Sequence, residues 1–537
     1  MLVPRPALVM APNKTLAAQL YGVRSRRNWG HGDFTDLKGL LKLAAEFGAS
    51  GVGLNPLHAL FDDRPDAYSP YSPSSRLFLN PLYIDPEAIA EFPGAAAELR
   101  DDIAALRATA LVDYAGVMAA KSRAFRLAYD SFRQNASPAR KQAFSAFRQK
   151  GGALLQRFAC FEILRRRFTT YWWDWPEEWR RPDDARLAVL RGAEDESAGY
   201  FEFLQWIAHL QLSACRDRAE ELGLSIGLYL DIAVGVRPDG FDAWNEQDVY
   251  DRTLEIGAPP DRLNLEGQRW GLAGVNPIAL EAHDCAPLRR MLHASMQYAG
   301  AVRLDHVMGL QRLYVIPDGL RGDQGAYVRF PFERQLAIVG EESVANRCIV
   351  VGEDLGTVPE NFRATMAEAG IWSYQVMLFQ RAEDGGFIAA DHYRENALVT
   401  FSTHDLPSFE GWKAGHDLAV KRALGLDPGE TEADRAAARE ALERAMRWRG
   451  LHGGDYREIV VFLAVTPSRL MMVPLEDALG LVEQVNVPGT IAEHPNWRRR
   501  LPVALEDLRA YAGLASLAET LSLHGRGAKS ERDRAKG

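Results

Sequence analysis

Short apolar runs that end in charged residues recur along this chain. The stretch from Ala301 to Gly309 reads AVRLDHVMG, in which Ala301–Leu304 is an apolar run broken by Arg303 that ends on Asp305 and His306. A single run of this kind could hold nothing more than a structural ion pair between Arg303 and Asp305. Three further runs end in the same way, with Asp231, with Glu353 and Asp354, and with His404 and Asp405. Their recurrence predicts buried strands whose C-terminal ends converge on one functional site.

Stretches of helical spacing and turn-rich loops separate these runs. Thr35 to Gly48 repeats apolar residues with the period of a helix and stops at a glycine. Four more apolar runs complete the predicted strands: Leu16–Val23, Gly51–Leu57, Ser373–Gln380 and Leu470–Pro474. No GxGxxG motif follows the first strand, which argues against a doubly wound sheet. The alternation of strand, helix and loop therefore predicts an α/β protein built on a (β/α)8 TIM barrel.

We expect one catalytic barrel over residues 1–523, interrupted by large helical and loop insertions. Residues 86–200, rich in Ala, Arg, Glu and Leu at helical spacing, predict a mainly helical insertion. A second helical insertion is expected at 414–455, and the polar tail at 524–537 is expected to be disordered. The YWWDWPEEW segment, Tyr171–Trp179, could form a sugar platform, but a local packed core is the favoured interpretation.

Residues 235–300 are turn-rich and predict a lid insertion. Their segment Gly257–Gly271 reads GAPPDRLNLEGQRWG, and its prolines and glycines disfavour a helix or a central strand. We therefore expect a loop that carries Gln268 and Trp270 beside the carboxylates. The long loop at 58–82, rich in Pro, Ser and Tyr, is expected to form an ordered wall.

Composition and charge restrict the classes of partner. With 47% hydrophobic and 25% charged residues, the 537-residue chain has the composition of an ordinary globular protein. Its net charge of −9, without a basic stripe, argues against nucleic acid and membrane surfaces as partners. The four cysteines show no CxxC or Cys/His metal spacing and fit reduced thiols in the cytoplasm. The sequence shows no signal peptide and no membrane-spanning run, requires no metal or cofactor, and gives no indication of oligomeric state.

The expected cluster of carboxylates suits acid/base and nucleophilic chemistry. Retaining glycosyl transfer uses two carboxyl groups about 5–5.5 Å apart, one to attack the anomeric carbon and one to protonate the leaving oxygen. Arg303 lies two residues before Asp305 on the same strand face and would keep this nucleophile ionised. Glu353 has no arginine so placed and is the acid/base candidate. Three further side chains are candidates for binding sugar hydroxyls: Asp405, His404 and His306.

Several motifs of the chain resemble those of one enzyme family. RLDH, VGEDLG and STHD are similar to the strand-end motifs of the α-amylase clan. NWGHGDFTDL (Asn28–Leu37), GAPPD…GQRWG and NVPGT…NW (Asn486–Trp497) resemble 4-α-glucanotransferase, or amylomaltase, of glycoside hydrolase family 77. The similarity extends from about Ser25 to Leu501, which is nearly the whole chain.

The resemblance implies an enzyme that cuts an α-1,4-glucan and passes the segment to the 4-hydroxyl of glucose or another glucan. Maltooligosaccharides, starch or glycogen would serve as donors and acceptors. By motif, the resemblance assigns the nucleophile to Asp305, the acid/base to Glu353 and the transition-state stabiliser to Asp405. It further implies binding roles for Arg303, His404, Asp231, Trp270 in the lid and Tyr68 in the DAYSPY loop.

The chain also departs from the family pattern. Val307 and Met308 follow RLDH where the family often has Phe-Arg, and Leu406 follows THD where it often has Asn. These departures leave acceptor binding and chain-length preference open. Since the chain begins almost at the barrel, we expect it to lack the N-terminal domain of some bacterial relatives. Two alternatives are an α-glucan hydrolase with the same three carboxylates, and a non-catalytic glucan-binding protein, which the presence of all three disfavours.

Overall fold

Eight parallel strands close into a barrel within the described residues of the computed structural model, which are 12–260, 266–447 and 449–526. The strand order around the barrel is β1-β14-β13-β12-β11-β8-β5-β2. The strands are β1 (Asn13–Ala18), β2 (Gly51–Leu54), β5 (Gly227–Ile232), β8 (Ala301–Leu304), β11 (Ile349–Gly352), β12 (Trp372–Val376), β13 (Ala397–Thr400) and β14 (Leu470–Pro474). The predicted (β/α)8 barrel is thereby confirmed.

The boundaries of most strands agree with the apolar runs. The predictions for β8 and β14 match the observed residues, and those for β2 and β12 differ only at their ends. The first strand is the exception, because β1 spans Asn13–Ala18 and the residues that follow, Leu20–Gly22, form a short 3₁₀ turn. The apolar end of β1, residues 16–18, runs almost directly into the buried residues of this turn, while β1 begins with the polar residues Asn13, Lys14 and Thr15, so hydrophobicity alone did not give the bounds of the strand.

Side chains of the barrel strands alternate between the interior and the surrounding helices. Interior-facing residues form their own cluster, which includes Tyr229, Ala301, Val351, Tyr374 and Met472. The outward-facing residues pack against helices, as expected for a closed parallel sheet with both faces covered. The helices that follow barrel strands include α1 (Phe34–Glu46), α7 (Asp195–Glu221), α10 (Ala286–Met296), α11 (Phe332–Asn346), α12 (Phe362–Glu368), α16 (Tyr456–Ala464), α17 (Leu475–Ala478), α18 (Leu505–Leu508) and α19 (Ala512–Leu523).

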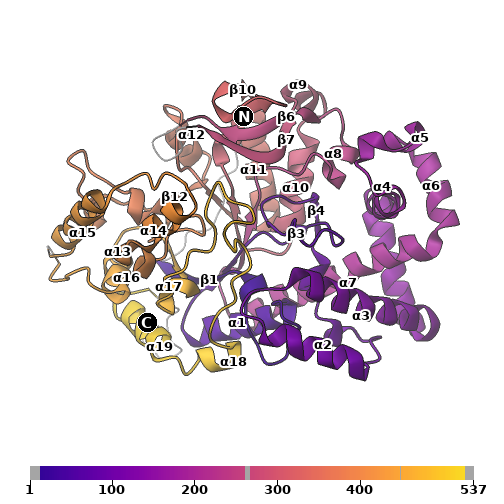
Figure 1. The fold of residues 1–537 in the computed structure, drawn as a ribbon, viewed down its shortest axis with the longest axis horizontal. Helices are drawn as coiled ribbons and strands as arrows, with labels where there is room; N and C mark the ends of the chain where they lie inside the picture. Colours follow the sequence, from indigo (N-terminus) through magenta and orange to yellow (C-terminus); the bar gives the residue numbers. More distant parts are fainter. Residues whose placement is uncertain (1–11, 261–265, 448, 527–537) are drawn as a thin grey trace.

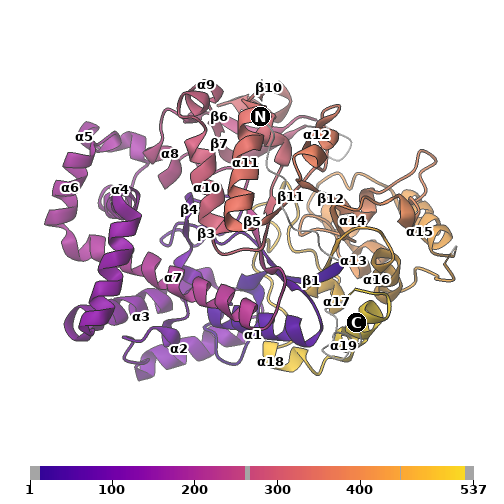
Figure 2. The same ribbon diagram turned by 180° about the vertical axis from the view of Figure 1, so that it is seen from behind.

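A group of helices covers one side of the barrel (Figures 1 and 2). It comprises α2 (Ala97–Ala108), α3 (Tyr114–Asn135), α4 (Pro138–Phe168), α5 (Glu177–Arg180) and α6 (Asp184–Ala193), packed against the long helix α7. A separate aromatic cluster lies here, in which Trp172 and Trp175 are buried with Phe158, Phe161 and Trp244. These rings pack as a core, which was the favoured interpretation of the YWWDW segment.

An antiparallel sheet stands above the barrel, and it corrects the prediction for the lid. In the described part of the chain its order is β10-β9-β6-β7, with β6 (Tyr250–Ala258), β7 (Gln268–Val275), β9 (Arg312–Pro317) and β10 (Ala326–Arg329). Gln268 and Trp270 therefore lie on a strand and not on the predicted loop. Position 257 requires a glycine because the two strands approach closely there: a Cβ on Gly257 would lie 2.0 Å from the carbonyl oxygen of Gln268. The register also shifts at this point, which is typical of a bulge.

The opposite side of the barrel carries α13 (Phe409–Ala414), α14 (His416–Ala423) and α15 (Glu432–Arg447) (Figure 1). The remaining short elements are β3 (His58–Ala59), β4 (Ser75–Leu79), α8 (Phe241–Asn245) and α9 (Pro277–Ala282). Among the described residues, no helix is both long and apolar enough to cross a bilayer.

The C-terminal segment is ordered further than predicted. Arg526 is fully buried, and its guanidinium donates hydrogen bonds to the carbonyl oxygens of Ala464 at 2.9 Å and Thr466 at 2.8 Å. It also donates to the carbonyl of Asn13 at 3.3 Å, which ties this segment to β1. The expected disorder is therefore wrong for Arg526, and residues 527–537 lie outside the described part of the chain.

Candidate active site

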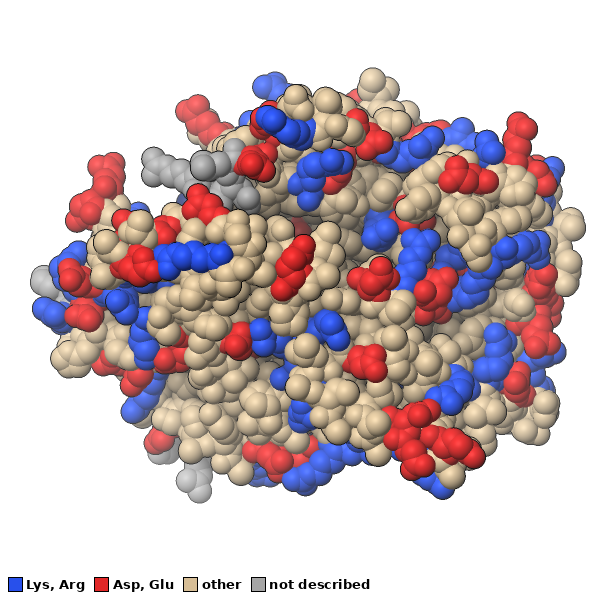
Figure 3. All heavy atoms as spheres, in the orientation of Figure 1, with Lys and Arg blue, Asp and Glu red and all other residues tan. Residues whose placement is uncertain are grey.

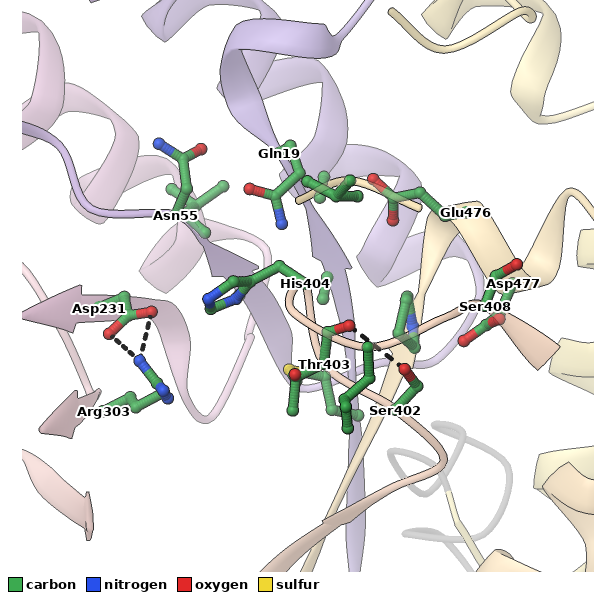
Figure 4. Close-up of a pocket in the computed structure, with 18 of the residues that line it drawn as sticks. Gln19, Asn55, Asp231, Arg303, Ser402, Thr403, His404, Ser408, Glu476 and Asp477 are labelled. Atoms are coloured by element: carbon green, nitrogen blue, oxygen red, sulfur yellow. Dashed lines mark hydrogen bonds and ion pairs between the residues drawn. The ribbon is translucent and has the colours of Figure 1, made fainter. Parts of the chain in front are cut away.

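Strand alternation brings Asp231 and Arg303 together inside the barrel. On β8 the side chain of Ala301 faces the interior, so that of Arg303, two residues later, does as well. The same alternation carries Asp231 inward on β5, where it is the register partner of Arg303. Nη1 of Arg303 donates to both carboxylate oxygens of Asp231, at 2.8 and 2.9 Å (Figure 4). This bifurcated hydrogen bond from a single guanidinium nitrogen ties Arg303 to Asp231.

Arg303 also contacts the predicted nucleophile. Asp305 follows β8 directly, and its Oδ1 lies 2.7 Å from Nη2 of Arg303. Arg303 is only 7% exposed, so water screens its charge weakly. The guanidinium therefore links two carboxylates, one on β5 and one beyond β8.

Glu353, which follows β11, is enclosed by backbone donors. Its Oε2 accepts from the N–H of His306 at 2.9 Å, and its Oε1 accepts from the N–H of Leu355 at 2.8 Å. Burial raises the pKa of Glu353 to about 7, and the charge of Asp305 adds to this rise, while Arg303 and the two N–H groups oppose it. A carboxyl group that keeps its proton near neutral pH can act as a general acid.

His306 connects the predicted nucleophile to the antiparallel sheet. Its φ of 46° is in the left-handed region, an uncommon conformation for a residue with a side chain, and its N–H donates to Glu353. Burial lowers the pKa of His306 to about 4, so its imidazole is neutral near pH 7. The ring of Trp270 packs edge-on against it at 5.3 Å, and Nε1 of Trp270 donates to Oε1 of Gln268 at 3.1 Å.

Asp405 and His404, which follow β13, form a hydrogen-bonded pair at the opening of the site. Nε2 of His404 lies 3.2 Å from Oδ2 of Asp405, and Nδ2 of Asn486 donates to Oδ1 of Asp405 at 2.6 Å. Burial alone would raise the pKa of Asp405, but His404 and Asn486 outweigh it and hold that pKa below its usual value. Burial likewise opposes protonation of His404, yet Asp405 raises the pKa of this imidazole. The lowered pKa keeps Asp405 ionised near neutral pH. Its side chain is 43% exposed, so a ligand can reach it.

Tyr71, which is not among the residues predicted from the sequence, completes the cluster. Its hydroxyl donates to Oδ2 of Asp231 at 2.5 Å and lies 3.2 Å from Nδ1 of His404. Its ring stacks on His404 at 4.7 Å. Tyr68, chosen from the same DAYSPY loop, is stacked in parallel on Tyr114 at 4.7 Å instead. Both tyrosines were visible in the motif, but only the path of the loop decides which one reaches the carboxylates.

A cavity of about 70 Å³ opens beside these residues at the C-terminal ends of the barrel strands (Figure 4). Tyr71, Asp231, Arg303 and His404 form one part of its lining. Tyr229, Tyr374 and residues 483–485 also line it, together with residues at or beyond the ends of β1, β2, β13 and β14 that include Gln19, Asn55, Thr403, Leu406 and Glu476. Location at the C-terminal end of a barrel is typical of active sites in this fold.

The charges of the site are balanced by protein groups. No group of three or more His, Cys, Asp or Glu side chains within the described residues could hold a metal ion. The site carboxylates are paired instead with Arg303, His404, Asn486 and backbone N–H groups. On the face shown in Figure 3, acidic and basic side chains are interspersed, without a large field of one sign. The arrangement therefore supports acid/base and nucleophilic chemistry by carboxylates.

Comparison with known proteins gives consistent matches over nearly the whole chain. A profile of a family described as 4-alpha-glucanotransferase matches residues 18–506. The 4-alpha-glucanotransferase of Haemophilus influenzae is 36% identical over 522 residues, covering 90% of this chain and 74% of the relative. That of Mycobacterium tuberculosis is 38% identical over 541 residues, covering 94% and 74%.

Two solved structures share the fold. Amylomaltase from Corynebacterium glutamicum superposes with a TM-score of 0.83 at 32% identity, covering 95% of this chain and 75% of that one. Amylomaltase from Streptococcus agalactiae in complex with acarbose gives a TM-score of 0.81 at 21% identity, covering 96% and 100%.

Proposed function

Because this chain belongs to the 4-alpha-glucanotransferase family, we propose that the cluster around Arg303 is the centre of its glucan transglycosylation. The chain is an enzyme that transfers α-1,4-glucan segments. The roles of individual side chains follow from the geometry of the cluster. The observation that carries them is a pair of neighbouring carboxyl groups in different environments: Asp305 is ion-paired with Arg303, and Glu353 is buried.

In the first half of the reaction, a carboxylate oxygen of Asp305 attacks the anomeric carbon of the donor glucan. Glu353 gives its proton to the glycosidic oxygen, so the bond from the anomeric carbon to that oxygen breaks. The reducing-end fragment leaves with a free 4-hydroxyl. The rest of the donor remains as a glycosyl ester on Asp305.

In the second half, Glu353 is a carboxylate and takes the proton from the 4-hydroxyl of an acceptor. The acceptor oxygen attacks the anomeric carbon, and the ester bond to Asp305 breaks. Two inversions restore the α configuration of the bond, and both carboxyl groups return to their starting protonation states.

The remaining polar side chains bind the donor sugar. Asp405, ionised and partly exposed, accepts hydrogen bonds from ring hydroxyls and stabilises the positive charge that develops on the ring. His404, Asp231 and Tyr71 form a connected hydrogen-bonded group beside it, so that one sugar can be held by several fixed contacts. Tyr68 would contact sugar only outside this group, on the outer wall of the site.

The antiparallel sheet is placed to favour a sugar acceptor over water. Trp270 on β7 packs against His306, the residue next to Asp305. An aromatic ring in this position can stack on the acceptor sugar, and together with Gln268 it would exclude water from the glycosyl ester. Maltooligosaccharides, starch and glycogen are the donors and acceptors in this proposal. A cytoplasmic location fits the four cysteines, which are all buried and unpaired.

Maltotriose alone tests this function. Incubation with the purified protein is expected to give glucose together with maltodextrins longer than maltotriose, while the number of reducing ends stays nearly constant. Shortening of maltotriose with a matching rise in reducing ends would instead identify a hydrolase. No change with maltotriose or longer glucans would contradict the catalytic roles given to Asp305 and Glu353.

A further inference from the structure

The wall of the cavity formed by β1 and β14 carries two polar residues that the chemistry above does not use. These strands are paired in register, with Ala17 opposite Pro474. Gln19 and Glu476 each lie two residues further along their chains, so they reach the same end of the barrel. Both line the cavity that also contains Asp231 and His404 (Figure 4).

Gln19 presents an acceptor without a donor. Its Oε1 is shielded from solvent and has no hydrogen-bond partner among the described residues. Asn55, on the adjacent wall, differs: it accepts from the N–H of Leu20 at 2.8 Å and donates to Tyr83 at 2.8 Å. Buried polar atoms in folded proteins are nearly always paired. The Asn55 amide is therefore structural, whereas that of Gln19 is available to a bound molecule.

Glu476 is also free of partners from other described residues, although its carboxylate, unlike Oε1 of Gln19, accepts a hydrogen bond from its own backbone. In the described part of the chain, no lysine or arginine is ion-paired with it, and no hydrogen bond from another residue reaches its carboxylate. Its neighbour Asp477 has a structural task, because its Oδ1 accepts from the N–H of Phe409 at 2.7 Å. Burial raises the pKa of Glu476 to about 7, so near neutral pH this carboxyl group can both donate and accept hydrogen bonds.

We propose that Gln19 and Glu476 are specificity residues that bind hydroxyl groups of the glucosyl unit held in this cavity. This inference rests on the proposed function. Hydroxyl groups are the complementary ligand, because they supply the donor that Gln19 lacks and exchange hydrogen bonds with Glu476. Asp231 and His404 hold the same sugar from the β5 and β13 side. A sugar lacking the matching hydroxyl would leave a buried acceptor unpaired, which is the strongest form of discrimination available to such a site.

Variants of both residues test the proposal in the full-length enzyme. Gln19→Leu and Glu476→Leu remove the polar groups at similar volume, and Glu476→Gln keeps a hydrogen-bonding group. We expect kcat/KM for maltotriose disproportionation to fall roughly 10- to 100-fold in the two leucine variants and less in Glu476→Gln. Glu440→Gln, an exposed carboxylate on α15, is the matched control and should retain wild-type kinetics. Thermal unfolding of each variant shows whether the fold is kept.

Maltotrioses that each lack one hydroxyl distinguish sugar binding from a structural role. For the wild type, one deoxy sugar should be used poorly relative to maltotriose. For Gln19→Leu, that same deoxy sugar and maltotriose should be used equally well, because the contact is already absent. The inference would be overturned, with transfer intact, if kcat/KM of the leucine variants stayed within about twofold of wild type. It would also be overturned if replacing maltotriose by the deoxy sugar lowered kcat/KM by the same factor in variant and wild type. Failure of the wild type to rearrange maltotriose would instead overturn the proposed function itself.

Discussion

The protonation of Glu353 should set the alkaline limit of activity. To test this, the pH is raised from 6 to 9 and kcat/KM for maltotriose disproportionation is measured at each pH. Burial raises the pKa of Glu353 from 4.5 to about 7, and the reaction begins from its protonated form. About 90% of Glu353 is then protonated at pH 6 and about 1% at pH 9, so kcat/KM should fall roughly 100-fold.

The shape of this profile also identifies the group. The fall should begin near pH 7 and approach tenfold per pH unit, because one proton is involved. The variant Glu353→Gln cannot give the proton, so it should be at least roughly 1000-fold less active and should lack this limb. Circular dichroism at each pH serves as the control for unfolding.

Two results would refute the reasoning. A profile that stays flat from pH 6 to 9 would mean that Glu353 is not the acid. A fall that is already tenfold per pH unit at pH 6, where a glutamate of ordinary pKa 4.5 is almost fully ionised, would mean that burial does not hold its proton. In either case the assignment of acid and nucleophile to these two carboxylates would need to be exchanged or abandoned.

Four further outcomes follow from the structure. Asp305→Asn should lose transfer by roughly 10⁴-fold at an unchanged thermal midpoint, because an amide cannot form the glycosyl ester; substantial product from maltotriose would contradict this. Tyr71→Phe should lower kcat/KM roughly tenfold while its ring still stacks on His404, and wild-type kinetics would show that the hydroxyl is dispensable. Trp270→Ala should raise KM for glucans without abolishing the reaction, and unchanged kinetics would remove β7 from acceptor binding. Since the folded-state pKa of Glu353 is raised, its contribution to stability is complete below pH 4.5 and is lost as pH rises through 7, about 3 kcal/mol in all. Other buried carboxyl groups with raised pKa values, those of Asp36, Glu476 and Asp477, titrate in both proteins, so urea unfolding at pH 4 and pH 8 should show a change that is about 3 kcal/mol larger in the wild type than in Glu353→Gln.

The barrel could be predicted because its strands are buried on both faces. Such strands appear in the sequence as short apolar runs, and the limits of β8 and β14 were predicted to the residue. The antiparallel sheet of β6, β7, β9 and β10 was not predicted. Its strands come from both sides of β8 in the sequence, and its glycines and register shift hide the usual alternation.

The site could be predicted only where a residue ends a strand. Asp231, Asp305, Glu353 and Asp405 follow apolar runs, so the topology gathers them without further information. Tyr71 reaches Asp231 from a loop 160 residues away, and no local pattern records that contact. Such a contact depends on the path that the loop takes through space, so it can be recognised only in the folded chain.

The barrel closes where β14 joins β1 to β13, and this order has a consequence for synthesis of the enzyme in the cell. β14 fills the slot between β1 and β13, pairing in parallel with both. When Asp405 has just emerged from the ribosome, the nascent chain already contains Asp305, Glu353 and Asp405. Its sheet, however, still has two open edges. Unpaired edges of this kind are prone to aggregation, and translation of the remaining residues takes several seconds at about 5–20 residues per second. The barrel can therefore close only after β14 has emerged, and the edges of β1 and β13 stay unpaired until then.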